Sequence, residues 1–236
     1  MQQQLAPLGV SYTFIDAIDG KNAPLSEFKA YNSTLRIKKY GRDLKNTEVA
    51  TTLSHLKALK HAQHHMKKHG DRWAVILEDD STILPSFISA LNALDTYPEH
   101  VHCVRLYERV KNTHNAPDCM DKNPDFSIHR STYKNWGGAL GYAVRISAIQ
   151  SYIRHNSIVL HKADKMLFGI PYDDVKLYQH RPRSVRVNDT ITSDIGYGEK
   201  HRYTGIRNNI IRIYMALIER LHRIIYRCKY WREYRQ

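Results

Sequence analysis

The chain has 236 residues, of which 36 are Lys or Arg and 23 are Asp or Glu, and its formal net charge is +13. The 42% hydrophobic and 25% charged composition is typical of a globular domain with its own core, and it excludes a chain that is disordered or coiled coil throughout. No run approaches about 18 uncharged apolar residues, and the N-terminal residues lack the basic and apolar regions of a secretory signal, so neither a membrane span nor a leader is predicted.

The first half of the chain alternates between strand and helix patterns. Residues 12–18 (YTFIDAI) favour a short buried strand that ends in an Asp-Gly turn. Residues 47–69 carry an apolar stripe at helical spacing, with Thr47 as a cap and a Gly directly after the last residue. The run WAVIL (residues 73–77) is typical of a strand buried on both faces. A helix is expected over residues 84–94.

The second half continues the alternation. A strand is expected at residues 101–107, a polar loop at 111–123 and a Gly-rich strand at 136–144. A helix at 147–155 and two short elements at 171–179 and 183–187 follow. Strands interleaved with helices predict an α/β domain with a Rossmann-like, largely parallel sheet. Three Cys without C-x-x-C spacing argue against a disulfide framework and favour a reducing compartment.

Three adjacent acids, Glu78, Asp79 and Asp80, follow the WAVIL run directly. Clustered carboxylates at the end of a buried strand repel one another, and burial adds to the cost. A divalent cation would relieve both effects, and a cation held by one or two carboxylates keeps positions open for phosphate oxygens. The alternative is that the triplet caps a helix beginning near Ser81, and spacing alone does not separate the two interpretations.

The order of several motifs resembles glycosyltransferase family 25, the lipopolysaccharide and lipooligosaccharide core transferases that also include collagen galactosyltransferases. The motifs that carry the resemblance are FIDAIDG (14–20), GRxLxxxExAxTLSH (41–55), LEDD (77–80), GxLGY (138–142), PYDD (171–174) and SDI (193–195). The resemblance covers roughly residues 1–200, and the first strand of the family pattern has no counterpart in this chain.

The resemblance implies a GT-A type fold, a UDP-sugar donor, a Mn²⁺ or Mg²⁺ ion and transfer with inversion. A hexose, galactose in β-1,4 linkage, is the expected donor sugar, and a lipooligosaccharide or lipopolysaccharide core is the expected acceptor. We therefore expect a transferase domain over residues 1–200 and a separate basic helix over residues 201–236. The expected location is cytoplasmic, peripheral at the inner membrane.

Within that resemblance, Asp79 and Asp80 are the expected metal ligands. Inverting transfer needs a base, which is usually a carboxylate. Asp173, aligned with the P-x-D of the family, is the preferred base, and Asp194 is the other catalytic candidate. Asp174 is expected on the acceptor side. Each of these three also fits a turn or cap aspartate.

The remaining expected site residues lie on the donor and acceptor sides. Arg42, Ser54, His55, Glu78 and Asp79 are assigned to the donor, and Gly138 would let backbone approach the acceptor sugar closely. For Arg42 a surface ion pair explains the residue as well, for His55 a hydrogen-bonded core position does, and for Gly138 tight packing does.

The last 36 residues carry nine Lys or Arg and two acids, more than half of the net charge. Seven apolar residues recur there at helical spacing: Ile206, Ile210, Ile213, Leu217, Leu221, Ile224 and Ile225. This basic amphipathic pattern is typical of a helix on an anionic membrane surface. Alternatively, the apolar side packs on the domain and the basic side is solvated.

Two other functions remain open at the level of sequence. A nucleic-acid-binding protein would explain the positive charge, but no recognised nucleic-acid-binding motif is present and the acidic triplet would repel phosphate. We therefore expect no nucleic-acid partner. A catalytically inactive family member is the other alternative.

Overall fold

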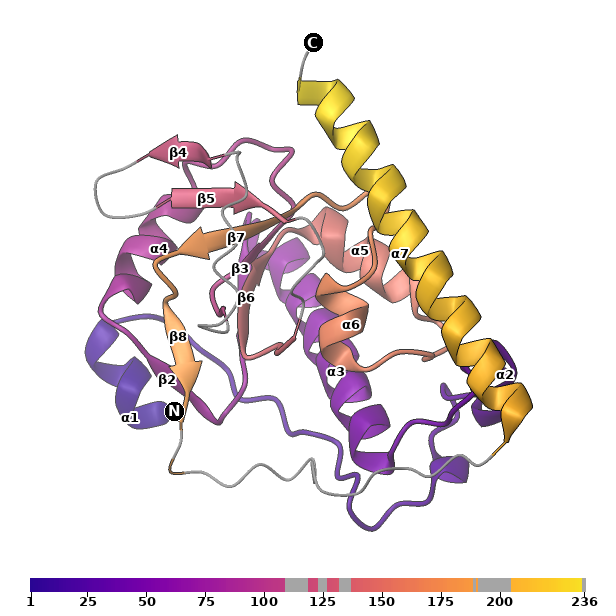
Figure 1. Cartoon of the computed structure of the whole chain (residues 1–236). Helices are drawn as coiled ribbons and strands as arrows, with labels where there is room; N and C mark the ends of the chain where they lie inside the picture. Colours follow the sequence, from indigo (N-terminus) through magenta and orange to yellow (C-terminus); the bar gives the residue numbers. More distant parts are fainter. Residues whose placement is uncertain (109–118, 123–126, 132–136, 189, 191–204, 235–236) are drawn as a thin grey trace.

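A computed structural model gives the structure of the chain, and it describes residues 1–108, 119–122, 127–131, 137–188, 190 and 205–234. A twisted sheet lies between helices on its two faces, and one long helix crosses the outside of the molecule (Figure 1). The mixed α/β class predicted from the alternating patterns is confirmed.

The central sheet has six strands in the order β1-β6-β3-β7-β5-β4. They are β1 (Ala74–Leu77), β3 (Cys103–Arg105), β4 (Cys119–Lys122), β5 (Ser127–Arg130), β6 (Gly141–Val144) and β7 (Leu177–Arg181). Only β3 and β7 run parallel, and the other neighbouring pairs are antiparallel. The prediction of a largely parallel sheet was therefore wrong. Strand β6 enters between β1 and β3 in the opposite direction, which the alternation of elements along the chain does not reveal.

A smaller sheet lies beside the end of β1. It pairs β2 (Ser81–Ile83) with β8 (Val185–Val187) in antiparallel register. Helix α1 (Gln2–Leu5) and a 3₁₀ turn (Ala6–Leu8) lie against this ribbon, where the Gln4 side chain bonds the backbone of Ser81 and Ile83.

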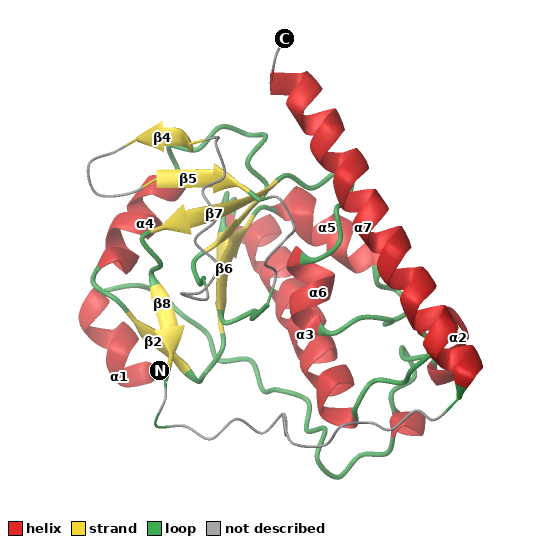
Figure 2. Ribbon diagram, viewed as in Figure 1, coloured by secondary structure: helices red, strands yellow, loops and turns green. Residues whose placement is uncertain are grey.

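Helices cover both faces of the central sheet (Figure 2). On one face lie α3 (Asn46–His69), α5 (Ile146–His155) and α6 (Ala163–Phe168), and on the other lies α4 (Ser86–Leu94). Successive residues of β6 point to opposite faces: Tyr142 and Val144 join the core under α3, while Ala143 joins the core under α4. The helices expected at 47–69, 84–94 and 147–155 are confirmed.

Two further helices and a 3₁₀ turn (Leu25–Glu27) complete the fold. Helix α2 (Ser33–Tyr40) ends at Gly41, and α7 (Ile206–Tyr234) is the long helix at the edge of the molecule. Helix α7 starts beside α2 and passes α6 on its way toward the C-terminus (Figure 1).

Residues 12–18 do not form the expected strand. The segment runs along α3 instead, where the backbone NH of Ile18 donates to Oγ of Ser54 (2.8 Å) and Nζ of Lys57 donates to the carbonyl of Asp16 (2.8 Å). Phe14 points outward with 57% of its surface exposed. Strand β1 is half-buried rather than buried on both faces, because it is an edge strand of the sheet.

Candidate active site

The acidic triplet forms the turn that joins β1 to β2. The backbone NH of Glu78 donates to the carbonyl of Leu140 (2.9 Å), and both the NH and Oγ of Ser81 donate back to the carbonyl of Glu78 (3.2 and 2.7 Å). Ser81 begins a strand, and α4 starts five residues later without a side-chain cap. The alternative interpretation of the triplet as a helix cap is therefore wrong, and we call residues 78–80 the acidic turn.

Asp80 is the most constrained carboxylate of the acidic turn. It is half-buried, and its Oδ1 is buried without a hydrogen-bond partner in the described part of the chain. Burial, together with the negative charges of Glu78 and Asp79, raises the pKa of Asp80 to about 6. No Lys or Arg among the described residues forms an ion pair with this carboxylate, so its negative charge lacks compensation from the fold.

Asp79 differs from its neighbour because its side chain is exposed. Both carboxylates belong to the same turn, and carboxylate oxygens are the ligands that Mn²⁺ and Mg²⁺ prefer. Across the residues that the structure describes, no group of three or more His, Cys, Asp or Glu side chains is arranged to hold a metal ion. A pair of carboxylates is chemically suited to a Mn²⁺ or Mg²⁺ ion, and an ion held by one or two carboxylates keeps positions open for phosphate oxygens and water.

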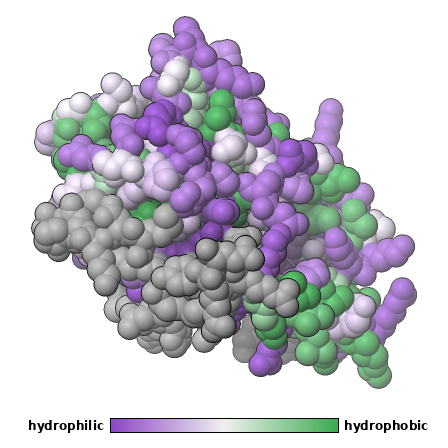
Figure 3. Space-filling view, turned by 90° about the horizontal axis from the view of Figure 1, so that it is seen from above, coloured by the Kyte–Doolittle hydropathy of each residue, from purple (hydrophilic) through white to green (hydrophobic). Residues whose placement is uncertain are grey.

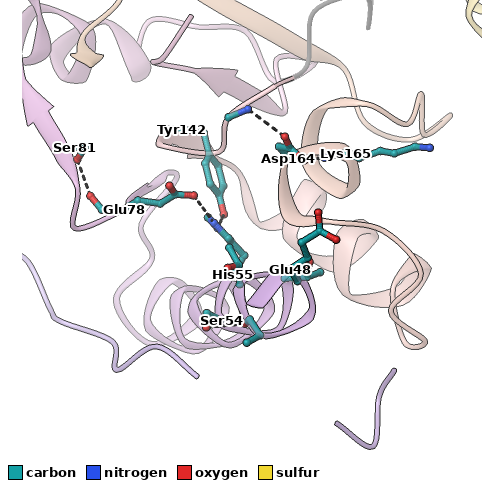
Figure 4. A network of polar contacts seen from close by, with 12 residues as sticks. Glu48, Ser54, His55, Glu78, Ser81, Tyr142, Asp164 and Lys165 are labelled. Carbon is teal, nitrogen blue, oxygen red and sulfur yellow. Dashed lines mark hydrogen bonds and ion pairs between the residues drawn. The ribbon is translucent and has the colours of Figure 1, made fainter. Parts of the chain in front are cut away.

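Glu78, the first acid of the turn, points inward toward α3 (Figure 4). Its Oε1 lies 3.0 Å from Nε2 of His55, and Nδ1 of the same imidazole lies 3.1 Å from the hydroxyl of Tyr142. His55 and Tyr142 are both buried, and burial keeps the pKa of the Tyr142 phenol well above its usual value. The neutral phenol and the imidazole together hold the Glu78 carboxylate in one orientation.

The loop before β6 lies close to the start of α6. Gly138 has a positive φ of 85°, and a Cβ there would come within 2.5 Å of the Tyr107 ring. Its backbone NH donates to Oδ2 of Asp164 (3.3 Å), and the Arg105 guanidinium donates to the carbonyl of Gly137 (3.0 Å). Because no side chain fits at Gly138, only backbone atoms of this residue face its neighbours.

Arg105 is a buried cation behind this loop. Burial lowers its pKa to about 10, while the charges of Glu108 and Asp164 act in the opposite direction. Asp164 lies beside this loop, and it was not among the candidates predicted from the sequence because it belongs to none of the motifs named there. The only local signal is its position in the first turn of α6, where an acid is favoured.

The register of the strands brings these groups to one edge of the sheet. Leu77, the last residue of β1, pairs with Gly141, and Arg105, the last residue of β3, pairs with Tyr142 and Gln179. The acidic turn, the loop 137–140 and the residues after β3 therefore lie at the same edge, which we call the site edge.

Asp173 and Asp174 do not reach the site edge. They precede β7, whose first residue, Leu177, pairs with Cys103 at the opposite edge. Oδ1 of Asp173 lies 3.8 Å from Nζ of Lys229 near the end of α7, and its side chain is 94% exposed. The structure therefore places Asp173 away from the acidic turn.

Asp174 has partners of its own on α5. Its carboxylate accepts hydrogen bonds from Oγ of Ser151 (2.7 Å) and from the Arg154 guanidinium, and Nε2 of His155 lies 3.8 Å away. These contacts tie the loop before β7 to α5. Asp174 therefore has a structural role, and its expected contact with the acceptor stays a prediction.

The two remaining donor-side candidates, Ser54 and Arg42, differ in whether their side chains are already engaged in contacts within the fold. Oγ of Ser54 accepts from the NH of Ile18 and donates to the carbonyl of Ala50 (2.8 Å each), so its hydrogen-bonding capacity serves the fold. Arg42 is exposed after the C-cap of α2 and forms no ion pair with the described residues. Its positive charge lies near that of Lys165 on α6 and helps to lower the pKa of Lys165, to which burial contributes most.

Asp194 lies outside the described residues, as does most of the polar loop expected at residues 111–123.

The sequence was compared with models of known protein families. The family described as glycosyltransferase family 25 (LPS biosynthesis protein) matches residues 1–167, which is well over half of the sequence. This chain belongs to glycosyltransferase family 25. The curated proteins contain no match to it.

Family 25 membership makes the chain a glycosyltransferase of lipopolysaccharide biosynthesis and confirms the resemblance seen in the motifs. The matched residues include the acidic turn, His55, Gly138 and Asp164, and they exclude Asp173 and Asp174. The segment that matches family 25 therefore contains the acidic turn and the loop 137–140 of the site edge.

Proposed function

We propose that this family 25 chain transfers a hexose, galactose in β-1,4 linkage, from a UDP-sugar to a core sugar of lipopolysaccharide or lipooligosaccharide, with inversion, on a GT-A type fold. The observation that carries the proposal is the half-buried Asp80 carboxylate. In the described part of the chain, its Oδ1 has no hydrogen-bond partner and no Lys or Arg forms an ion pair with it. A binding site for a cation and a diphosphate explains why such a costly charge is present.

Asp79 and Asp80 would hold the Mn²⁺ or Mg²⁺ ion. When bound, such an ion neutralises the charge that develops on the leaving diphosphate. Arg42, exposed and without an ion-pair partner in the described part of the chain, has the charge and the fork geometry to bind a phosphate oxygen. Glu78, held by His55, keeps the turn in shape for both roles.

The acceptor hydroxyl needs a carboxylate that takes its proton as it attacks the anomeric carbon. Of the carboxylates at the site edge, Glu78 is bound by His55 and Glu108 is paired with Arg181 (2.7 Å). Among the described residues, Asp164 accepts hydrogen bonds from two backbone NH groups, those of Gly138 and Lys165, and from no side chain. We propose Asp164 as this base in place of Asp173, with Asp194 as a further candidate outside the described residues.

The acceptor of such a transferase is carried on a lipid. We propose that the protein works as a peripheral protein on the cytoplasmic side of the inner membrane. None of the helices within the described residues is long and apolar enough to cross a bilayer.

A donor screen tests the proposed function. The protein is incubated with UDP-galactose, UDP-glucose and UDP-N-acetylglucosamine, with Mn²⁺, with Mg²⁺ or with EDTA, and released UDP is measured. We expect release from UDP-galactose with either metal and none with EDTA or in Asp80→Asn. UDP release that is unchanged by EDTA and by Asp80→Asn would overturn the metal-dependent site.

A further inference from the structure

Helix α7 is attached to the rest of the protein along one of its faces. Close to its start, the backbone of Asn208 packs against Gly41, where an added Cβ would lie 2.4 Å from the Asn208 carbonyl oxygen. In the middle, Glu219 forms an ion pair with Lys165 of α6. Further along, the hydroxyl of Tyr226 accepts hydrogen bonds from Nε and Nη2 of Arg130 (3.1 and 2.8 Å). These three contacts fix the rotation of α7 about its own axis.

The opposite face of α7 carries large apolar side chains that remain in solvent. Eight of them are between 47% and 82% exposed: Ile206, Ile210, Ile213, Tyr214, Leu217, Leu221, Ile224 and Ile225. Their spacing of three and four residues places them along one side of the helix, and we call them the apolar stripe. At ~1.5 Å per residue the apolar stripe is about 28 Å long.

The apolar stripe is the main exposed hydrophobic feature of the described surface. Outside α7 the exposed large apolar residues are few and scattered: Tyr12, Phe14, Ile158 and Val187. In Figure 3 hydrophobic residues gather on the right-hand side, the side on which α7 lies in Figure 1. The structure argues against the alternative in which α7 packs its apolar side on the domain, because the side that contacts the body carries Asn208, Glu219 and Tyr226.

The charge of α7 limits what can cover the apolar stripe. Residues 206–229 contain six Lys or Arg and one acid, Glu219, whose carboxylate is occupied by Lys165. A second copy of the protein docked through the same stripe would bring two rows of Arg together without acids to match them. An anionic lipid surface offers both an apolar layer for the stripe and negative headgroups for the Arg beside it.

We propose that α7 lies flat on an anionic bilayer, with the apolar stripe in the interface between headgroups and acyl chains and the opposite face still attached to α2, α6 and β5. The helix then connects the body of the protein to the bilayer, because one face contacts the body while the opposite face contacts the lipid. This inference deepens the proposed function, on which it rests for the lipid-linked acceptor. It places the body of the transferase directly on the surface that carries the substrate.

Vesicle flotation of the full chain tests the inference in the absence of donor and acceptor. We expect the protein to float with vesicles of phosphatidylcholine and phosphatidylglycerol in a 7:3 ratio, and to bind pure phosphatidylcholine much more weakly. The variant Leu217→Gln/Leu221→Gln should lose about tenfold or more in affinity for the mixed vesicles. The matched control is Phe14→Gln, which removes an equally exposed apolar side chain outside α7 and should float like the wild type.

Three further measurements separate the possible outcomes. Equal melting temperatures for the stripe variant and the wild type would show that the loss is not unfolding. A concentration-dependent dimer that the stripe variant abolishes, without flotation of the wild type, would assign the stripe to a second copy and overturn the proposal. Asp80→Asn should float normally, so failure of the metal site and failure of the membrane surface give different results.

Discussion

Nε2 of His55 lies 3.0 Å from Oε1 of Glu78, while the other nitrogen of the same buried imidazole is bound to the hydroxyl of Tyr142. The histidine of the SH motif therefore acts inside the protein on the first acid of the LEDD motif. Two motifs that are 23 residues apart in the chain meet in one hydrogen bond, and this contact joins the long helix α3 to the acidic turn.

The first prediction concerns this contact. His55→Ala should lower the free energy of unfolding by about 1–3 kcal/mol, because it leaves the Tyr142 hydroxyl and part of Glu78 without partners. It should also reduce kcat, because the acidic turn loses its support. Chemical denaturation and UDP release measure the two effects. The control is His64→Ala, an exposed histidine on the same helix, which should change stability by no more than about 0.5 kcal/mol.

The second prediction separates metal binding from folding at Asp80. Asp80→Asn should weaken Mn²⁺-dependent UDP binding by about 100-fold or more, because changes even to the outer-shell partners of a metal site cost about 10–100-fold in affinity. Without metal the same variant should be at least as stable as the wild type, since it removes a half-buried charge that its neighbours repel. Calorimetric titration of UDP with and without Mn²⁺ measures the first effect, and Asp95→Asn, an exposed acid on α4's C-cap, is the control. A variant that binds UDP and Mn²⁺ normally would exclude Asp80 as a ligand.

The third prediction compares two aspartates as the catalytic base. Asp164→Asn should reduce kcat by about 10²–10⁴-fold with little effect on UDP binding, because general base catalysis contributes on that scale. Asp173→Asn, at the opposite edge of the sheet, should stay within about twofold of the wild type. Single-turnover transfer to a soluble core oligosaccharide distinguishes them. A large loss in the Asp173 variant alone would restore the original assignment.

The fourth prediction is a pH dependence of stability that arises at His161. Burial, with smaller effects from the positive charges of Lys165, Arg36 and Lys39, lowers the pKa of this imidazole to about 3. In the unfolded chain the pKa is about 6.5, so the unfolded state binds the proton first as the pH falls. The free energy of unfolding should therefore decrease below about pH 6.5, by up to about 1.4 kcal/mol per pH unit from this residue.

The corresponding experiment follows urea unfolding between pH 7 and pH 5. His161→Asn should be less stable than the wild type at pH 7, since the contact of Nε2 with the Tyr40 hydroxyl (3.0 Å) is lost. Its stability should fall less steeply toward pH 5. His64→Asn, at an exposed position, should keep the wild-type slope, and parallel slopes in all three proteins would exclude His161 as the source.

Most individual elements could be predicted from the sequence because the forces that form them are local. The apolar period of α3, its Gly70 C-cap and the apolar run of β1 all lie within short stretches of chain, and the structure confirms the helix, its end and the strand. The burial of β1 on both faces was predicted wrongly, because it depends on the place of the strand in the sheet. The family could be recognised for a related reason, since the motifs around His55, Asp80 and Gly138 occur in a characteristic order. The segment at residues 12–18 was assigned wrongly because a strand also needs a neighbouring strand, and none of the described strands pairs with it.

Sequence alone could identify a strongly basic α/β transferase with an acidic turn after a strand and an amphipathic helix at its end. Which carboxylates share the site, and which face of α7 meets solvent, became clear only in the folded chain. The direction of β6 between β1 and β3 brings the loop with Gly138 to the same end of the sheet as the acidic turn, and Asp164 lies there through its contact with the Gly138 NH, while Asp173 lies at the other end. Such proximity depends on packing between distant parts of the chain, and residue spacing carries no information about it.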